Sequence, residues 1–240
     1  MSKAIALLLM HKYNKIFMQI KAIIFDMDGL MLDTEPIAEM GWRRALADWG
    51  YHLSHELYLS VIGTTIVNAR RVWVESFGVD LPIEAIYQRH QEYINAHIDE
   101  HGIPIKPGLL DLLTWLEQRH FPKAVGSSTQ RARVLHKLNF TGLQDYFNII
   151  VGGDEVTHGK PAPDIFLAAA ELLHISPHEC VVLEDSEAGI RAAHAAGMIS
   201  IMIPDLKTPS AEIKPLARQI FPSLMEAHAF FESNHFEIIL

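Results

Sequence analysis

The sequence predicts an α/β protein with a doubly wound parallel sheet and an inserted helical domain. Short apolar runs rich in valine and isoleucine recur along the chain, and helical patterns separate the later runs. Roughly a hundred residues with helical patterning separate the first two runs, far more than an ordinary crossover between parallel strands requires. The alternation predicts the sheet, and the long interruption predicts the inserted domain.

The predicted strands are continuously apolar, as expected for strands that are buried on both faces. In chain order they are IKAIIFD at 20–26, PKAVGSS at 122–128, FNIIVGG at 147–153, CVVLED at 180–185 and ISIMIP at 199–204. The intervening segments carry apolar residues at helical spacing. They are PGLLDLLTWLEQRH, PDIFLAAAELLH and SEAGIRAAHAAG, the last with a capping-type Ser186 at its start and Gly197 at its end.

Apolar stripes at helical spacing also predict helices between the first two strands. The stripes are Trp42, Ala45, Leu46 and Trp49; Ile66, Ala69 and Trp73; and Ile83, Ile86, Tyr87 and His90. We therefore assign residues 34–103 to a helical cap, and residues 18–33 and 104–240 to the α/β core. The two linkers, near 33–36 and 100–107, are expected to form a hinge that lets the cap open and close.

Residues 1–17 are predicted to be an N-terminal extension without a catalytic role. The run AIALLLM is too short to span a membrane, and no small-residue cleavage site follows it. We expect a leader here; the alternative is a short helix packed on the body of the protein.

Composition limits the class of partner. The 240 residues carry a formal net charge of −9, which argues against nucleic acids or anionic membranes as main partners. The one cysteine, Cys180, excludes a disulfide within the chain, and a cytoplasmic location is the simplest interpretation. Because Cys180 opens the apolar run CVVLED, we expect a small core residue and not a catalytic thiol.

Two aspartates follow the first predicted strand. In an extended chain, residues i and i+2 face the same side, so Asp26 and Asp28 point into one pocket while Met27 points away. Gly29 lets the chain turn without a side chain crowding that pocket. Two carboxylates this close repel each other unless a divalent cation binds or one of them stays protonated.

Other polar groups follow the ends of later strands, and ligands bind at the carboxyl ends of strands in open α/β sheets. Ser127 and Ser128 end the second strand, Glu184 and Asp185 end the fourth, and Lys160 precedes a helix. Carboxylate oxygens suit Mg²⁺, whereas lysine and hydroxyl donors suit a phosphate group. This set of groups favours phosphoryl transfer to an aspartate nucleophile.

The sequence resembles the haloacid dehalogenase superfamily over about residues 18–230, with a Rossmann-like core. Four motifs carry the resemblance, in order: DMDGLMLDTE, VGSST, GKPAPDIF and LEDSEAGI. Within the superfamily, the chain is similar to the beta-phosphoglucomutase-like branch, which has a helical cap after the first motif.

The resemblance implies a role for each motif. Asp26 would be the nucleophile that forms an aspartyl-phosphate, and Asp28 the general acid and then the general base. The implied Mg²⁺ ligands are Asp26, Asp28 through its backbone carbonyl, Glu184 (as a ligand or a supporting partner) and Asp185. The implied phosphate-binding residues are Ser127, Ser128, Lys160 and Gly29.

Matching the motifs favours a phosphatase acting on sugar, polyol or nucleotide monophosphates over a mutase. Where the mutases of this branch hold a second phosphate with a histidine, an arginine and a lysine, this chain has Ala38, Ile66 and Gln130. A phosphosugar mutase is one alternative, and a non-catalytic protein that binds a phosphorylated metabolite is another. The expected partner is a small phosphorylated metabolite, and we expect a monomer, since one core and cap complete the site.

Several other polar residues receive structural interpretations. Asp33 is expected at the cap hinge, with Thr34 opening the linker, and Asp164 is expected to favour its own helix and support Lys160. We expect the histidines to be surface or core residues. Four arginines of the insert either reach a substrate or form a solvated face, and the second is the more usual outcome; they are Arg43, Arg44, Arg70 and Arg71.

Overall fold

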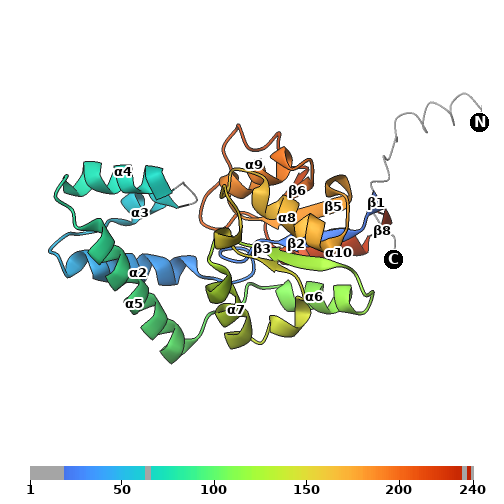
Figure 1. The fold of residues 1–240 in the computed structure, drawn as a ribbon, viewed down its shortest axis with the longest axis horizontal. Helices are drawn as coiled ribbons and strands as arrows, with labels where there is room; N and C mark the ends of the chain where they lie inside the picture. Colours follow the sequence, from blue (N-terminus) through green and yellow to red (C-terminus); the bar gives the residue numbers. More distant parts are fainter. Residues whose placement is uncertain (1–18, 63–65, 234–236, 239–240) are drawn as a thin grey trace, which may run out of the picture.

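The computed structural model describes residues 19–62, 66–233 and 237–238. A six-stranded, fully parallel sheet forms the centre of the molecule, in the order β4-β3-β2-β5-β6-β7 (Figure 1). The predicted fold class is confirmed, and each predicted strand is present. The strands are β2 Ala22–Phe25, β3 Lys123–Gly126, β4 Ile150–Val151, β5 Cys180–Glu184, β6 Ile199–Met202 and β7 Gln219–Ile220.

Strands β2 to β6 are buried on both faces of the sheet, which explains why they have no polar alternation. Successive residues of a strand point to opposite faces. In β2, Ile23 and Phe25 join one hydrophobic cluster, whereas Ala22 and Ile24 join another. Helices cover the two clusters. The first face is covered by α6 Leu109–Glu117, α7 Arg131–Phe140 and α10 Leu224–Glu232, and the second by α8 Asp164–Leu173 and α9 Glu187–Ala195.

Several short or irregular elements were not predicted. Strands β7 and β8 Glu237–Ile238 have two residues each, too few to show a periodicity. The predicted first strand at 20–26 is divided, because Ile20 belongs to β1 Gln19–Ile20, which pairs with β8, and β2 begins at Ala22. Helices α7 and α10 and the cap helix α3 also lack a prediction. Short 3₁₀ turns at Gln144–Tyr146, Gly153–Glu155 and Pro177–Glu179 complete the core.

In the described part of the insert the chain forms four helices, which stand apart from the sheet (Figure 1). They are α2 Glu35–Ala47, α3 His55–Val61, α4 Ile66–Phe77 and α5 Ile83–His101. They enclose a hydrophobic cluster of their own, with Leu46, Trp73 and Ile86 at its centre. No helix in the described part of the chain is long and apolar enough to cross a membrane.

The predicted apolar stripe of the first cap helix extends too far. Trp49 lies beyond the end of α2 and is 40% exposed. The chain leaves the helix through Gly50, whose φ of +81° belongs to the left-handed region that favours glycine. Trp49 therefore does not belong to the hydrophobic cluster that the cap helices enclose.

The two connections between core and cap lie side by side. The Asp33 N–H donates to the Pro104 carbonyl (2.8 Å), and Leu32 pairs with Ile105 as an isolated antiparallel bridge. Lys106 Nζ lies 2.9 Å from Asp33 Oδ1 and reinforces the crossing with an ion pair. The two connections that would form the expected hinge are therefore adjacent and bonded to each other. The predicted N-terminal extension and the side chain of Ile66 lie outside the described residues.

Candidate active site

A cavity of about 360 Å³ opens at the carboxyl ends of the central strands. The sheet topology brings the ends of β2, β3 and β5 together there, as expected for an open α/β sheet. All the predicted site residues except Gly29 line the cavity: Asp26, Asp28, Ser127, Ser128, Lys160, Glu184 and Asp185. Residues from four sequence motifs thus meet in one place.

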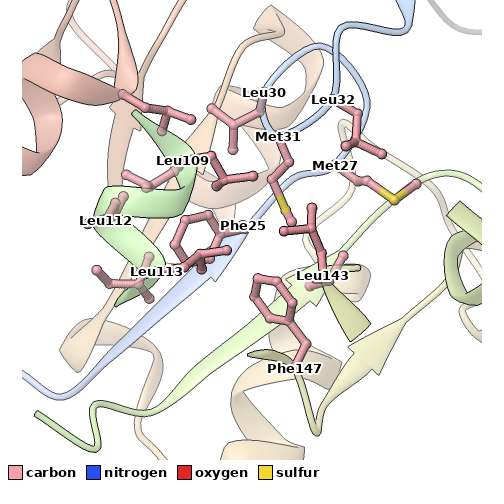
Figure 2. Close-up of a cluster of buried hydrophobic side chains, with 14 of the residues drawn as sticks. Phe25, Met27, Leu30, Met31, Leu32, Leu109, Leu112, Leu113, Leu143 and Phe147 are labelled. Carbon is pink, nitrogen blue, oxygen red and sulfur yellow. The ribbon is translucent and has the colours of Figure 1, made fainter. Parts of the chain in front are cut away.

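The loop after β2 holds its two aspartates by burying the residues between and after them. Asp26 continues the strand, because its N–H donates to the Leu183 carbonyl of β5 (3.0 Å). Met27, Leu30 and Met31 are buried in the hydrophobic cluster that also contains Leu109 and Leu113 of α6 (Figure 2). Met27 therefore faces away from the cavity, as predicted, and the carboxylates of Asp26 and Asp28 face it.

Gly29 lies against the carboxylate of Asp185. It adopts a φ of +87°, and a Cβ built on it would lie 2.4 Å from Asp185 Oδ2. Gly29 is not among the described residues that line the cavity. Its predicted contact with a phosphate thus has no support from the cavity, whereas its lack of a side chain lets Asp185 approach the loop.

Lys160 joins two of the predicted acidic residues. Its ammonium lies 2.5 Å from Asp26 Oδ1 and 2.7 Å from Glu184 Oε1, and its side chain is only 5% exposed. The other oxygen of Glu184 accepts the N–H of Ser186 (2.6 Å). The lysine is therefore a buried cation held beside Asp26. Burial acts to lower its pKa, but its two carboxylate partners outweigh burial and raise the pKa.

Three acidic residues could hold a metal ion. Asp26, Glu184 and Asp185 each offer an oxygen, and these oxygens lie within 4.8 Å of one another. Burial, and then the charge of Glu184, raises the pKa of Asp185 well above its usual range. Burial also raises the pKa of Asp26 to about 7, despite the opposing charge of Lys160. Carboxylate oxygens are the ligands that Mg²⁺ prefers, and a divalent ion would relieve the repulsion between these three carboxylates.

Asp28 has a different environment from Asp26. Its Oδ1 lies 2.5 Å from Lys137 Nζ, and its Oδ2 accepts the hydroxyl of Thr129 (2.7 Å). Burial acts to raise its pKa, but the charge and hydrogen bond of Lys137, with Thr129 and Thr34, outweigh it and lower the pKa. The sequence analysis assigned no role to Lys137, which lies in none of the four motifs, or to Thr129, which ends the motif VGSST.

The hydroxyl donors of the second motif lie at the end of β3. Ser127 is almost fully buried at the cavity wall, and its Oγ accepts the N–H of Thr129 (3.1 Å). Ser128 also lines the cavity but is exposed. The Ser127 hydroxyl keeps its own proton for a ligand oxygen, which is what a phosphate-binding role requires.

Other candidates from the sequence lie elsewhere. Asp164 begins α8 and accepts from His158 (3.1 Å to Nδ1), so it orders the loop before Lys160 instead of contacting Lys160. Cys180 is buried, and burial raises the pKa of its thiol to about 12, which fits a core residue. The insert arginines contact cap residues and do not line the cavity: Arg43 binds Glu39, Arg44 lies over Tyr93, Arg70 pairs with Glu84 and Arg71 pairs with Glu75.

Part of the cavity wall was not predicted from the sequence. It comprises Glu35 at the start of α2, Ile62 after α3, and the segment after β6 with Asp205, Leu206 and Lys207. The segment with Asp205, Leu206 and Lys207 follows the end of β6, and this position could have indicated that it lines the cavity, because segments after parallel strands meet at one edge of the sheet. Polar residues there lack a recognisable spacing, so the sequence alone gave them no role.

Comparisons with known proteins agree with this arrangement. Residues 20–197 match the family described as haloacid dehalogenase-like hydrolase. The fructose-1-phosphate phosphatase YqaB of Escherichia coli is 34% identical over 180 residues, covering 75% of this chain and 94% of that protein. The crystal structure of CbbY from Rhodobacter sphaeroides in complex with phosphate is similar with a TM-score of 0.74 and 29% identity, covering 87% of this chain and 96% of that one. A beta-phosphoglucomutase structure from Clostridium difficile has a TM-score of 0.72 and 25% identity, covering 90% and 97%.

Proposed function

Because the chain belongs to the haloacid dehalogenase-like hydrolases, we propose that it is a Mg²⁺-dependent phosphatase of small phosphomonoesters. The observation that carries the proposal is the shared cavity, in which Asp26 and Asp28 face Ser127, Lys160 and Asp185. The similarity to a fructose-1-phosphate phosphatase supports sugar or polyol phosphates as substrates, beside the nucleotide monophosphates expected from the motifs.

The proposed reaction has two steps, and both use the first motif. The Asp26 carboxylate attacks phosphorus, the bond to the alcohol oxygen breaks, and Asp28 gives that oxygen a proton. Asp28, now a carboxylate, then takes a proton from water as the water oxygen attacks the aspartyl-phosphate. Inorganic phosphate leaves, and both carboxyl groups return to their starting states.

Ser127 and Lys160 would bind the phosphoryl oxygens during both steps. Lys160 already lies beside the attacking carboxylate at 2.5 Å, so its charge is where negative charge gathers on the transferring group. Fixed donors of this kind need no rearrangement during the reaction, which is why they stabilise a transition state well.

The Mg²⁺ would be held by Asp26 and Asp185, with Glu184 as a ligand or a supporting partner and the backbone carbonyl of Asp28 as a further oxygen. When bound, a divalent ion offsets the charge shared by these carboxylates and the phosphoryl group. Burial, and then the charge of neighbouring carboxylates, raises the pKa values of Asp26 and Asp185, so these groups would gain from a divalent partner, and this supports the assignment.

A phosphosugar mutase is the second candidate, because a beta-phosphoglucomutase shares the fold at 25% identity. Two observations favour hydrolysis. Ala38 supplies no charge, and Gln130 is not among the described residues that line the cavity. Phosphate hydrolysis that proceeds faster than interconversion of glucose phosphate isomers, with the bisphosphate present, would exclude the mutase.

The test is phosphate release from fructose 1-phosphate, glycerol 3-phosphate, uridine 5′-monophosphate and p-nitrophenyl phosphate, with and without Mg²⁺. We expect activity in the parent protein that Asp26→Asn and removal of Mg²⁺ each abolish. Equal activity in both proteins would indicate a contaminant and contradict the proposal. Phosphate binding without turnover of any ester would instead favour the non-catalytic alternative, a protein that binds a phosphorylated metabolite.

A further inference from the structure

The cavity has a second part that the proposed reaction does not use. Its wall combines cap residues and core residues, and beside the apolar Ile62, Met202 and Leu206 it holds four charged side chains. Glu35 comes from the first turn of α2, Glu187 from the first turn of α9, and Asp205 and Lys207 from the segment after β6. A substrate whose phosphate lies at Asp26 would place its organic part against these groups.

Lys207 is the cation of this second part. Its Nζ donates to the Ile62 carbonyl (2.6 Å), which lies at the end of the cap helix α3. Within the described chain, no carboxylate forms an ion pair with Lys207, although Glu187 and Glu35 lie near enough to act on its charge. The lysine side chain thus reaches across from core to cap, and the carbonyl fixes the ammonium at the cavity wall.

The other lysines near the cavity have their charges matched. Lys160 lies between Asp26 and Glu184, and Lys106 lies between Asp33 and Asp205. An ammonium carries three N–H donors, and the single bond to Ile62 leaves two for another acceptor. Burial lowers the pKa of Lys207, as expected for a cation that has lost water without gaining a carboxylate partner.

We propose that Lys207 is a specificity-determining residue, whose free N–H groups bind a hydroxyl or carbonyl oxygen in the organic part of a sugar or polyol phosphate. This inference rests on the proposed phosphatase function and narrows its substrate class. Asp205 lines the same part of the cavity, with Oδ1 bound to Lys106 and Oδ2 buried without a hydrogen bond from the described residues.

The charges of this part of the cavity favour a neutral organic group. A hydroxyl accepts from Lys207 and donates to a carboxylate at the same time. A second phosphate or a carboxylate would accept from Lys207 but would face Glu35, Glu187 and Asp205 without a proton to give them. Phosphates of sugars and polyols therefore fit, and bisphosphates and phosphorylated acids do not.

The test compares Lys207→Met with the parent on fructose 1-phosphate, glycerol 3-phosphate and p-nitrophenyl phosphate, which has no hydroxyl. Losing a charged hydrogen bond is expected to raise KM about tenfold or more for the first two substrates, with kcat nearly unchanged. For p-nitrophenyl phosphate, kcat/KM should stay within about threefold. Lys207→Arg should retain most of the affinity, and the exposed Lys214→Met serves as a control for the lost charge.

A binding measurement separates this inference from the proposed function. In an Asp26→Asn background, calorimetry should record fructose 1-phosphate binding about tenfold weaker with Lys207→Met and inorganic phosphate binding unchanged. No turnover of any ester by the parent protein would overturn the phosphatase proposal. Equal losses for all substrates, no loss at all, or no binding of fructose 1-phosphate would overturn the role of Lys207.

Discussion

Lys137 Nζ lies 2.5 Å from Asp28 Oδ1, although 109 residues separate the two in the sequence. Lys137 comes from α7, and its side chain is only 10% exposed. This cation, with Thr129 and Thr34, lowers the pKa of Asp28 although burial alone would raise it. Asp28 is therefore ionised in the free protein at neutral pH, which is the form that the second proposed step needs, and it must take up a proton in the substrate complex before the first step.

In Lys137→Met, kcat is expected to depend on pH through the ionisation of Asp28. Without the cation, burial dominates, so the pKa of Asp28 rises from below its usual range. With p-nitrophenyl phosphate, whose leaving group needs no acid, the step that needs ionised Asp28 should limit turnover. The variant should then lose kcat as the pH falls toward the raised pKa, whereas the parent should keep its kcat over the same range.

Lys137→Arg is the matched variant, because it keeps the charge and should restore most of the parental profile. Activity measured from about pH 5 to pH 9 covers the range in which a raised carboxyl pKa would appear. A parental profile in Lys137→Met would contradict the electrostatic role of this lysine. An equal fall at every pH would also count against it, since that result indicates misfolding and not a shifted pKa.

Mg²⁺ is expected to stabilise the protein more at high pH than at low pH. Burial and neighbouring carboxylates raise the pKa of Asp26 to about 7, so folding favours its protonated form. The stability that this preference contributes is present at low pH and is lost as the pH rises toward 7. A metal ion binds only the ionised form, so Mg²⁺ should raise the melting temperature more at about pH 8 than at about pH 6.

Two substitutions calibrate this measurement by differential scanning calorimetry. Asp185→Asn removes a proposed ligand and should abolish the Mg²⁺ response at both pH values. Asp80→Asn changes an exposed aspartate of the cap and should leave the response intact. An equal response at the two pH values, or a full response in Asp185→Asn, would count against the assigned metal site.

Burial on both faces made the central strands predictable, and motifs placed at strand ends made the cavity predictable. Asp26, Ser127 and Asp185 follow β2, β3 and β5 directly, so the topology alone brings them together. Lys137 could not be found in this way. Its partner lies 109 residues away, and which face of α7 meets the cavity depends on tertiary packing.

The segment after β6 illustrates a second limit of the sequence. Asp205 and Lys207 follow a strand that was predicted, but their partners belong to other segments. Asp205 meets Lys106 at the hinge, and Lys207 meets Ile62 in the cap. Such contacts depend on how the cap sits on the core, and no local pattern encodes that placement.

His90 is expected to make the folded protein less stable as the pH falls. Burial lowers its pKa to about 4, and its ring stacks on Trp42 with centroids 4.1 Å apart. The folded protein therefore keeps His90 neutral, while the unfolded chain takes up a proton below about pH 6.5. Stability should fall as the pH decreases from about 6.5 toward 4, by up to about 1.4 kcal/mol per pH unit from this group.

His90→Phe keeps an aromatic ring against Trp42 and removes the titrating group. Urea unfolding at several pH values should give a shallower acid slope for this variant than for the parent. His52→Phe replaces an exposed histidine and should keep the parental slope. Identical slopes in all three proteins would refute the contribution of His90.

Gly29→Ala should damage the metal site and not merely the backbone. Gly29 and Gly50 share a positive φ, +87° and +81°, so alanine at either position should cost about 1–2 kcal/mol of stability. A Cβ at Gly50 meets no atom within 4 Å, whereas a Cβ at Gly29 would lie 2.4 Å from Asp185 Oδ2. Only Gly29→Ala must displace a proposed Mg²⁺ ligand, so only this variant should weaken Mg²⁺ activation, by about 10–100-fold in the concentration required. Gly50→Ala, measured by the same activity titration, controls for backbone strain, and equal Mg²⁺ requirements in the two variants would mean that Gly29 serves only the turn.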